Sequence, residues 1–225
     1  MEDQEKKVVI AASAFNVSIH ITMCENFKKL FKPEEMTLRS LTADTKVQKD
    51  RLMQALIQTK CTALIAMSIQ PDAETIAAYT AANVPIVLTD EEAAGASTIA
   101  ADNVIGGRMA GEYLIKKGRT KIGIVSGRTK VKGGLNAVQR LKGFQQALAA
   151  AKLLIPQGCL IEVPNYSRED SIEVMPKLLA AGVDAIFCAA GDNCAQGLLS
   201  VARDRKVRIP QDVAIVGFDA RTYYY

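Results

Sequence analysis

Short apolar runs recur along the chain, separated by longer segments with helical periodicity, and this alternation constrains the fold more than any other feature. The runs read VVIAAS, TALIAM, PIVL, KIGIVSG, DAIFCAA and VAIVGF. Nearly every position in them is apolar, which is typical of parallel strands that helices cover on both faces. With helical segments such as 46–59 and 103–117 between them, the runs predict a doubly wound α/β fold.

Helix punctuation agrees with this pattern. Asp72 and the pair Asp44-Thr45 can cap the helices that follow them, and Gly118 can end the helix that starts near residue 103. We expect helices between parallel strands near residues 8–13, 36–41, 63–67, 85–88, 121–126, 184–189 and 213–217.

The stretch TIAADNVIGG is the one plausible change of domain, because one βα series ends there and another begins. No long linker, repeat or low-complexity segment marks the chain. We therefore predict one α/β subdomain over residues 1–101 and a second over residues 102–225, joined by a short hinge.

Composition narrows the class of protein. The chain has 225 residues and is 49% hydrophobic, enough for a sizeable core. Its net charge of +4 comes from interspersed residues and indicates no partner. No apolar stretch reaches the roughly 18 residues of a membrane span, and the amino end is acidic and polar, unlike a signal peptide. These features predict a cytoplasmic globular protein.

The five cysteines are odd in number and show no spacing that could hold zinc. We interpret them as reduced thiols in the core and predict no metal site. They are Cys24, Cys61, Cys159, Cys188 and Cys194.

Three aspartates follow apolar runs: Asp90, Asp192 and Asp219. Ligands of open α/β sheets bind beyond the carboxyl ends of the strands, although each of these acids could also be only a helix cap. Arg140 lies on a helical segment and could equally be a surface arginine. Together, three carboxylates and one guanidinium suit a small polyhydroxylated or heterocyclic ligand, because carboxylates accept hydroxyl or N–H bonds and arginine donates a rigid fork.

Motifs of catalysis are mostly absent from the sequence. It contains no GxSxG, Walker A, GxGxxG or HExxH pattern, and GGRMAG is explained better by helix packing than by a dinucleotide loop. The three strand-end aspartates could hold Mg²⁺ as in a phosphatase, but no lysine or Ser/Thr stands at a matching strand end. We predict a non-enzymatic protein without a cofactor and keep the Mg²⁺-dependent enzyme as an alternative.

Four stretches carry a resemblance to a known family: ADNVIGGRMAGEYLIKKGRTKIGIVSG, QRLKGFQQAL, AAGDNCAQG and RIPQDVAIVGFDA. In this order and spacing the chain resembles, from Val8 to Asp219, the effector-binding core of the lactose-repressor/purine-repressor family and the related type 1 periplasmic binding proteins. The resemblance implies two doubly wound parallel-sheet subdomains around a ligand cleft. It also implies a transcriptional regulator that binds a small polar effector, a sugar or a purine-like base.

The resemblance also implies roles for single residues. Arg140 would grip the effector, Asp192 and Asp219 would be acids of the second subdomain, and Asp90 would be the acid of the first. The complete implied ligand-binding set is Ser13, His20, Asp90, Asn136, Arg140, Tyr166, Asp192 and Asp219.

The chain departs from the family pattern in three ways. Gly191-Asp192 stands where many sugar-binding members have Asn-Asp, no helix-turn-helix of about 60 residues precedes Val8, and the family continues beyond the strand that ends at Asp219. We therefore expect a chain truncated at its carboxyl end, with an incomplete first subdomain. The family further implies a homodimer that reaches DNA only through the helix-turn-helix. A solute-binding protein for transport or chemoreception remains an alternative.

Overall fold

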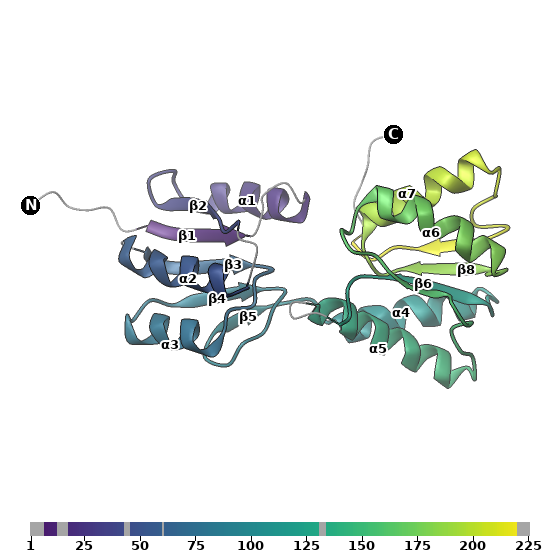
Figure 1. Cartoon of the computed structure of the whole chain (residues 1–225), viewed down its shortest axis with the longest axis horizontal. Helices are drawn as coiled ribbons and strands as arrows, with labels where there is room; N and C mark the ends of the chain where they lie inside the picture. The colour runs from purple at the N-terminus through teal and green to yellow at the C-terminus, as the bar shows by residue number, and fades with distance from the viewer. Residues whose placement is uncertain (1–6, 13–17, 43–45, 60, 131–133, 220–225) are drawn as a thin grey trace, which may run out of the picture. The chain divides into compact units, whose positions relative to one another are not determined.

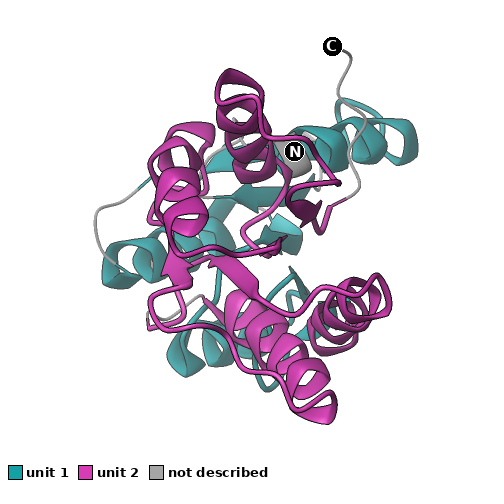
Figure 2. Cartoon of the chain, turned by 90° about the vertical axis from the view of Figure 1, so that its right-hand side faces the viewer, with its two compact units in different colours: residues 1–101 teal, residues 102–225 magenta. Residues whose placement is uncertain are grey.

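The structure is a computed structural model that describes residues 7–12, 18–42, 46–59, 61–130 and 134–219. The chain divides into two compact units, Met1–Ala101 and Asp102–Tyr225, called unit 1 and unit 2 below (Figures 1 and 2). No helix in the described ranges is long and apolar enough to span a membrane. Ser13 and the pair Asp44-Thr45 lie outside the described residues.

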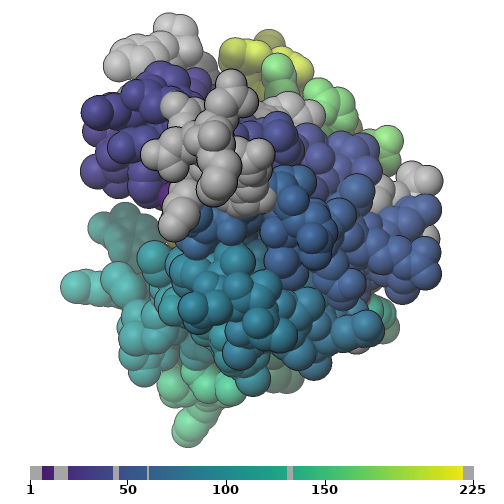
Figure 3. Space-filling view, turned by 90° about the vertical axis from the view of Figure 1, so that its left-hand side faces the viewer, coloured from purple at the N-terminus to yellow at the C-terminus, as the bar shows by residue number. Residues whose placement is uncertain are grey.

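Unit 1 is built on a five-stranded parallel sheet with the order β2-β1-β3-β4-β5. Its elements are β1 (Lys7–Ala12), α1 (Ser18–Leu30), β2 (Met36–Ser40), α2 (Lys46–Leu56), the 3₁₀ turn η1 (Ile57–Thr59), β3 (Cys61–Met67), α3 (Ala73–Ala81), β4 (Ile86–Thr89) and β5 (Ser97–Ile99). Figure 3 views this unit from the end at which β1 begins.

Alternate residues of β1 enter two different cores. Ile10 and Ala12 pack with Cys24 of α1, whereas Val9 and Ala11 share a cluster with α2 and α3, where Tyr79 is fully buried. Successive side chains of a strand point to opposite faces of the sheet, so helices cover β1 on both sides. This confirms the parallel, doubly covered sheet that the apolar runs predict.

Unit 2 repeats the plan with a four-stranded parallel sheet of order β7-β6-β8-β9. Its elements are α4 (Asn103–Lys116), β6 (Ile122–Ser126), α5 (Leu135–Ala150), β7 (Leu160–Glu162), α6 (Arg168–Ala180), β8 (Ala185–Cys188), α7 (Asp192–Asp204) and β9 (Ala214–Val216). One core cluster lies between the sheet and α4 and α5, and another lies between the sheet and α6 and α7.

All seven predicted strands are present within two residues of the expected bounds, and two more, β5 and β7, were not predicted. Both are edge strands of three residues. All three residues of β5 are exposed, and none of β7 is fully buried. An edge strand has a neighbour on one side only and need not be apolar throughout, so neither segment carries the pattern by which the other strands are recognised.

Helix boundaries follow the predicted caps where they are described. The Asp72 carboxylate accepts a hydrogen bond from the amide of Thr75 (2.7 Å) at the start of α3. Gly118 directly follows Lys117, the C-cap residue of α4, and has φ of +77°. This left-handed conformation costs glycine little.

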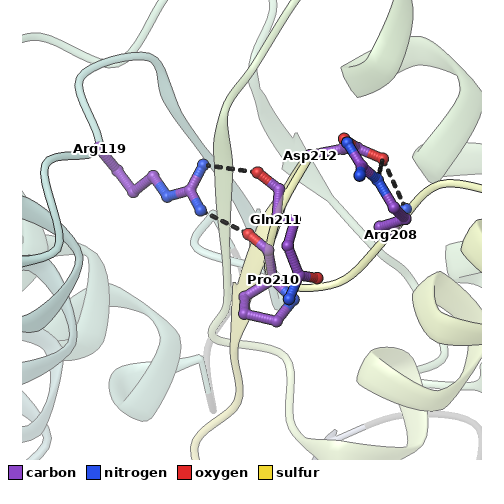
Figure 4. A network of polar contacts seen from close by, with 5 residues as sticks. All are labelled: Arg119, Arg208, Pro210, Gln211 and Asp212. Atoms are coloured by element: carbon purple, nitrogen blue, oxygen red, sulfur yellow. Dashed lines mark hydrogen bonds and ion pairs between the residues drawn. The ribbon is translucent and has the colours of Figure 1, made fainter.

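The loop that leads into β9 is fixed by arginine contacts (Figure 4). The guanidinium of Arg119 donates to the carbonyl oxygens of Pro210 and Gln211. Arg208 pairs with Asp212, with an Nη2–Oδ1 distance of 2.5 Å, and lowers the pKa of the Asp212 carboxyl to about 2. These contacts hold the chain in place just before β9. Asp219 follows the carboxyl end of this strand.

Glycines allow α4 and α5 to pack backbone against backbone. A Cβ at Gly143 would lie 1.9 Å from the carbonyl oxygen of Val104, and one at Gly107 would lie 2.1 Å from that of Arg140. Both contacts are too short for any side chain, and the oxygen atoms belong to rigid backbone. Gly107 and Gly111 of GGRMAG therefore serve the packing of α4 on α5, and Gly107 lets the backbone of Arg140 lie against α4.

Gly143→Ala is expected to destabilise the protein by about 3 kcal/mol or more, because the two helices must separate to admit the methyl group. Helix propensity alone would give the opposite sign, a gain of about 1 kcal/mol. Urea unfolding measures the change, with Gln146→Ala, at an exposed position of the same helix, as the control. A stability equal to that of the natural chain would contradict the close helix contact.

Candidate functional site

The guanidinium of Arg140 is held in place by contacts within unit 2. Its Nε donates to Oδ1 of Asn103 (2.8 Å), and its Nη1 donates to the carbonyl oxygen of Ala189, just beyond β8 (2.8 Å). Its Cζ lies 3.6 Å from the centroid of the Phe218 ring, within the range of a cation–π contact. The side chain is half-buried, so its environment differs from that of a solvated surface arginine.

Asn103 connects two of the predicted site residues. It is 1% exposed, and while its oxygen accepts from Arg140, its Nδ2 donates to Oδ1 of Asn136 (3.0 Å). Asn103 is the first residue of α4, directly after the N-cap Asp102. Nothing in the sequence distinguishes Asn103, since a polar residue after a helix cap gives no sign of being buried.

Asp192 and Asp219 lie together at the carboxyl ends of β8 and β9. The backbone amide of Asp192 donates to Oδ2 of Asp219 (3.4 Å). A Cβ at Gly191 would lie 2.7 Å from that same oxygen, and a Cβ at Gly217 would lie 2.8 Å from Oδ1 of Asp192. Glycine at both positions leaves room for the carboxylates where they lie, and Gly191 also has φ of +96°, a conformation that favours glycine. Asp219 thus acts at the amino end of α7, where a negative charge is favoured, as in the helix-cap alternative.

These contacts join the predicted residues of unit 2 into two groups. Asn136 is linked to Arg140 through Asn103, and Asp192 contacts Asp219, which directly follows Phe218 in the chain. Phe218 was missed as a functional residue, although it lies in the quoted run VAIVGF, because strand periodicity does not reveal a ring placed under a guanidinium. Unit 2 therefore holds both carboxylate acceptors and a guanidinium donor that is fixed in place.

Tyr166 contacts the carboxyl end of β6. Its hydroxyl accepts a hydrogen bond from the amide of Arg128 (3.0 Å), and a Cβ at Gly127 would lie 2.3 Å from a ring carbon. The guanidinium of Arg128 is 5.7 Å from the ring centroid. The ring therefore packs against the carboxyl end of β6. Tyr166 itself has φ of +57°.

The two described candidates of unit 1 lie beside the ends of β3 and β4. His20 of α1 is 6% exposed, and its Nε2 is 3.2 Å from the hydroxyl of Ser68. The amide of Ser68 in turn donates to the carbonyl of Thr89 (3.0 Å). Asp90 follows directly, with φ of +62° and its amide bonded to the carbonyl of Ile99 (3.0 Å).

A buried acid that the sequence analysis did not consider lies next to Asp90. Glu91 is 3% exposed, and its Oε2 has no hydrogen-bond partner among the described residues. Burial, with smaller effects from the charges of Asp90 and Glu92, raises the pKa of Glu91 to about 6. A buried carboxyl without a partner disfavours its charged form, so this site holds a proton more tightly than an ordinary glutamate.

In the described part of the chain no three His, Cys, Asp or Glu side chains gather as a metal-binding group.

The fold and these strand-end networks define a class of protein: α/β ligand-binding proteins with parallel-sheet units. The family model described as "Periplasmic binding protein domain" matches residues 4–222. The chain belongs to this family, which confirms the resemblance to the lactose-repressor/purine-repressor core and its periplasmic relatives.

The curated proteins to which the chain is similar include transcriptional repressors. The chain is 32% identical, over 142 residues, to the HTH-type transcriptional repressor PurR of Escherichia coli O1:K1; the match covers 61% of this chain and 40% of that protein. The chain thus spans about two fifths of the length of the curated relatives that it matches.

Solved structures share the fold. One is a periplasmic binding protein/LacI transcriptional regulator from Alkaliphilus metalliredigens, complexed with D-xylulofuranose. It has 25% identity and a TM-score of 0.77, and the match covers 96% of this chain and 78% of that one. Another is a LacI family regulator from Enterococcus faecium with bound ribose. It has 20% identity and a TM-score of 0.76, over 94% and 77% of the two chains.

Replacing Glu91 by glutamine removes the buried charge and gives a pH-dependent change in stability. The pKa of Glu91 is about 6 in the folded protein and about 4.3 in an unfolded chain. The protonated acid therefore contributes stability that is fully present below pH 4.3 and is lost as the pH rises through 6.

Between pH 5 and pH 7.5 we expect the natural chain to lose about 1 kcal/mol relative to Glu91→Gln. Urea unfolding at the two pH values measures this difference. Glu34→Gln, at an exposed position of unit 1, is the control and should show no such change. Parallel pH profiles for the natural chain and Glu91→Gln would mean that Glu91 titrates normally.

Proposed function

We propose that this chain is the effector-binding core of a transcriptional regulator of the lactose-repressor/purine-repressor type, and that it binds a small polyhydroxylated ligand without catalysis. Two observations in unit 2 carry the proposal. The Arg140 guanidinium is fixed by Asn103, Ala189 and the Phe218 ring. Asp192 and Asp219 contact each other at the ends of β8 and β9. Fixed charged groups suit a ligand that is recognised by hydrogen bonds, because little conformational entropy is lost on binding.

We further propose a pentose as the first ligand class to test. Paired carboxylates accept from vicinal hydroxyls and arginine donates to ring or hydroxyl oxygens, and two structures of the same fold are described with D-xylulofuranose and ribose. A purine-like base is the second class, since the curated relative is named PurR. Asn136, Tyr166, His20, Asp90 and Ser13 remain predicted contributors.

The proposed regulator acts in the cytoplasm as a homodimer and contacts DNA through a helix-turn-helix domain. The name of the curated relative, an HTH-type transcriptional repressor, supports only the contact with DNA.

Calorimetric titration of the chain with D-ribose, D-xylulose, hypoxanthine and guanine tests the proposal. We expect saturable binding of at least one pentose. Binding of hypoxanthine or guanine, but of neither sugar, would favour purine-like bases over pentoses as the ligand class. Binding of none of the four compounds would contradict both proposed ligand classes.

Arg140→Lys is expected to weaken binding of the compound identified in that titration by about 10- to 100-fold, the usual effect of losing charge-assisted hydrogen bonds. An ammonium group cannot reproduce the planar fork or the stacking on Phe218. Arg203→Lys, at an exposed position in the last turn of α7, is the matched control and should bind normally. If the affinity of Arg140→Lys is unchanged and circular dichroism shows an intact fold, Arg140 does not contact the ligand.

A further inference from the structure

The sheet of unit 2 has an open edge at β7. The strand order places β7 at one end of the sheet, and among the described strands it pairs with β6 alone. The carbonyl of Cys159 accepts a hydrogen bond from β6 (2.8 Å), and the amide of Val163 donates one to β6 (2.9 Å). Backbone groups of alternate residues point to opposite sides of a strand, so the amides and carbonyls of Leu160 and Glu162 face away from β6.

A cavity of about 250 Å³ lies beside this edge, between β7 and α6. Its apolar surface comes from Ile161, Val163 and Val174, which also contact the core between the sheet and α6 and α7. Sites for drug-sized molecules usually occupy about 300–1,000 Å³, so this cavity suits one long side chain. A strand added to the edge of β7 would direct every second side chain to the face on which the cavity lies.

The rim of the cavity is acidic, although the whole chain carries a net charge of +4. Four carboxylates and one ammonium group line it, those of Glu162, Glu169, Asp170, Glu173 and Lys177. Two of the carboxylates already have donors within unit 2. Glu162 accepts from the hydroxyl of Thr129, and Asp170 accepts from backbone amides in the capping box at the start of α6.

Glu169 and Glu173 are the two acids of the rim without a donor. They lie one turn apart on α6, both are exposed, and neither makes a hydrogen bond or ion pair within the described part of the chain. Two like charges at this spacing destabilise a helix. The amino end of α6 favours an acid in its first turn, but Glu173 lies beyond that turn. A cation bound between the two carboxylates would remove their repulsion.

We propose that the open edge of β7 and this cavity form a docking site for an extended segment of a partner protein that carries a lysine or an arginine. The segment adds to β7 as a further strand and pairs with the backbone of Leu160 and Glu162. The methylene groups of its basic side chain pack on the apolar surface of the cavity, and the cation lies between Glu169 and Glu173.

A second copy of the chain does not suit this site. Two β7 strands paired about a two-fold axis would bring the same acidic rim together from both copies, and like charges disfavour such an interface. Pro164 directly after β7 has no N–H and limits the pairing to the three residues of the strand. The charged side chain must therefore supply much of the specificity. None of these residues belongs to the proposed effector site, so the docking does not depend on the proposed ligand.

Three fluorescein-labelled octapeptides test the site by fluorescence polarisation with the full chain. The first alternates threonine and valine around one central lysine and should bind saturably. The second has glutamate in place of the lysine and should bind at least about tenfold more weakly, because its charge repels the acidic rim. The third has the lysine between two prolines, which have no N–H to donate to a neighbouring strand, and it should also bind at least about tenfold more weakly.

Variants of the rim make the test specific. Glu169→Gln and Glu173→Gln should each weaken binding of the lysine peptide about 2- to 5-fold, and together about tenfold, the range for partly exposed ion pairs. Lys177→Glu replaces the ammonium group of the rim by a carboxylate and should strengthen binding. Glu112→Gln, at an exposed carboxylate of α4, is the matched control and should bind as the natural chain does.

A ¹⁵N spectrum locates the bound peptide. The lysine peptide should shift the amide resonances of β7 and of α6, and it should leave those of unit 1 in place. Shifts confined to other elements, equal affinities for the three peptides, or no saturable binding up to about 1 mM would each overturn the proposal. So would an unchanged affinity in the double variant Glu169→Gln/Glu173→Gln, since the cation would then bind elsewhere.

Discussion

The close contact between α4 and α5 is the constraint on which the rest of unit 2 depends. With glycine at 107 and 143, the two helix backbones come together at distances that no side chain would allow. Asn103 and Arg140 therefore face each other at 2.8 Å, one from each helix. The same packing lets the guanidinium reach the carbonyl beyond β8 and the ring beyond β9. A helix contact made for packing thus also orients the main candidate for ligand recognition.

At the strand ends of unit 2, glycines leave space for two carboxylate groups. Gly191 and Gly217 leave space for the carboxylates of Asp219 and Asp192, and the two loops interlock through these acids. The acids at the ends of β8 and β9 are therefore positioned by contacts with the loop that carries the other acid.

The candidate residues of unit 1 are organised differently. His20, Ser68 and Asp90 are joined mostly through backbone contacts at the ends of β3 and β4. Beside them Glu91 and Thr89 each bury a polar oxygen that has no partner among the described residues. Buried polar groups are usually hydrogen bonded, so these two oxygens mark the part of unit 1 where stability should respond most to pH or to substitution.

The sequence by itself determined the sheets and the positions of the acids. Runs such as KIGIVSG and DAIFCAA are apolar throughout because both faces of a parallel sheet are buried, and the strand ends follow from that pattern. Asp90, Asp192 and Asp219 could therefore be placed at the carboxyl edges of their sheets, and the family resemblance added Arg140 and Asn136. The helix-packing role of GGRMAG was predictable because its spacing excludes a dinucleotide loop.

Only the tertiary structure decided which side chains meet. Asn103 and Arg140 are 37 residues apart, and nothing in their local patterns states that one is buried against the other. The ring of Phe218 under the guanidinium and the burial of Glu91 are hidden for the same reason. Periodicity reports which face of an element is buried, whereas hydrogen bonds, stacking and pKa shifts depend on atoms that packing brings together from distant parts of the chain.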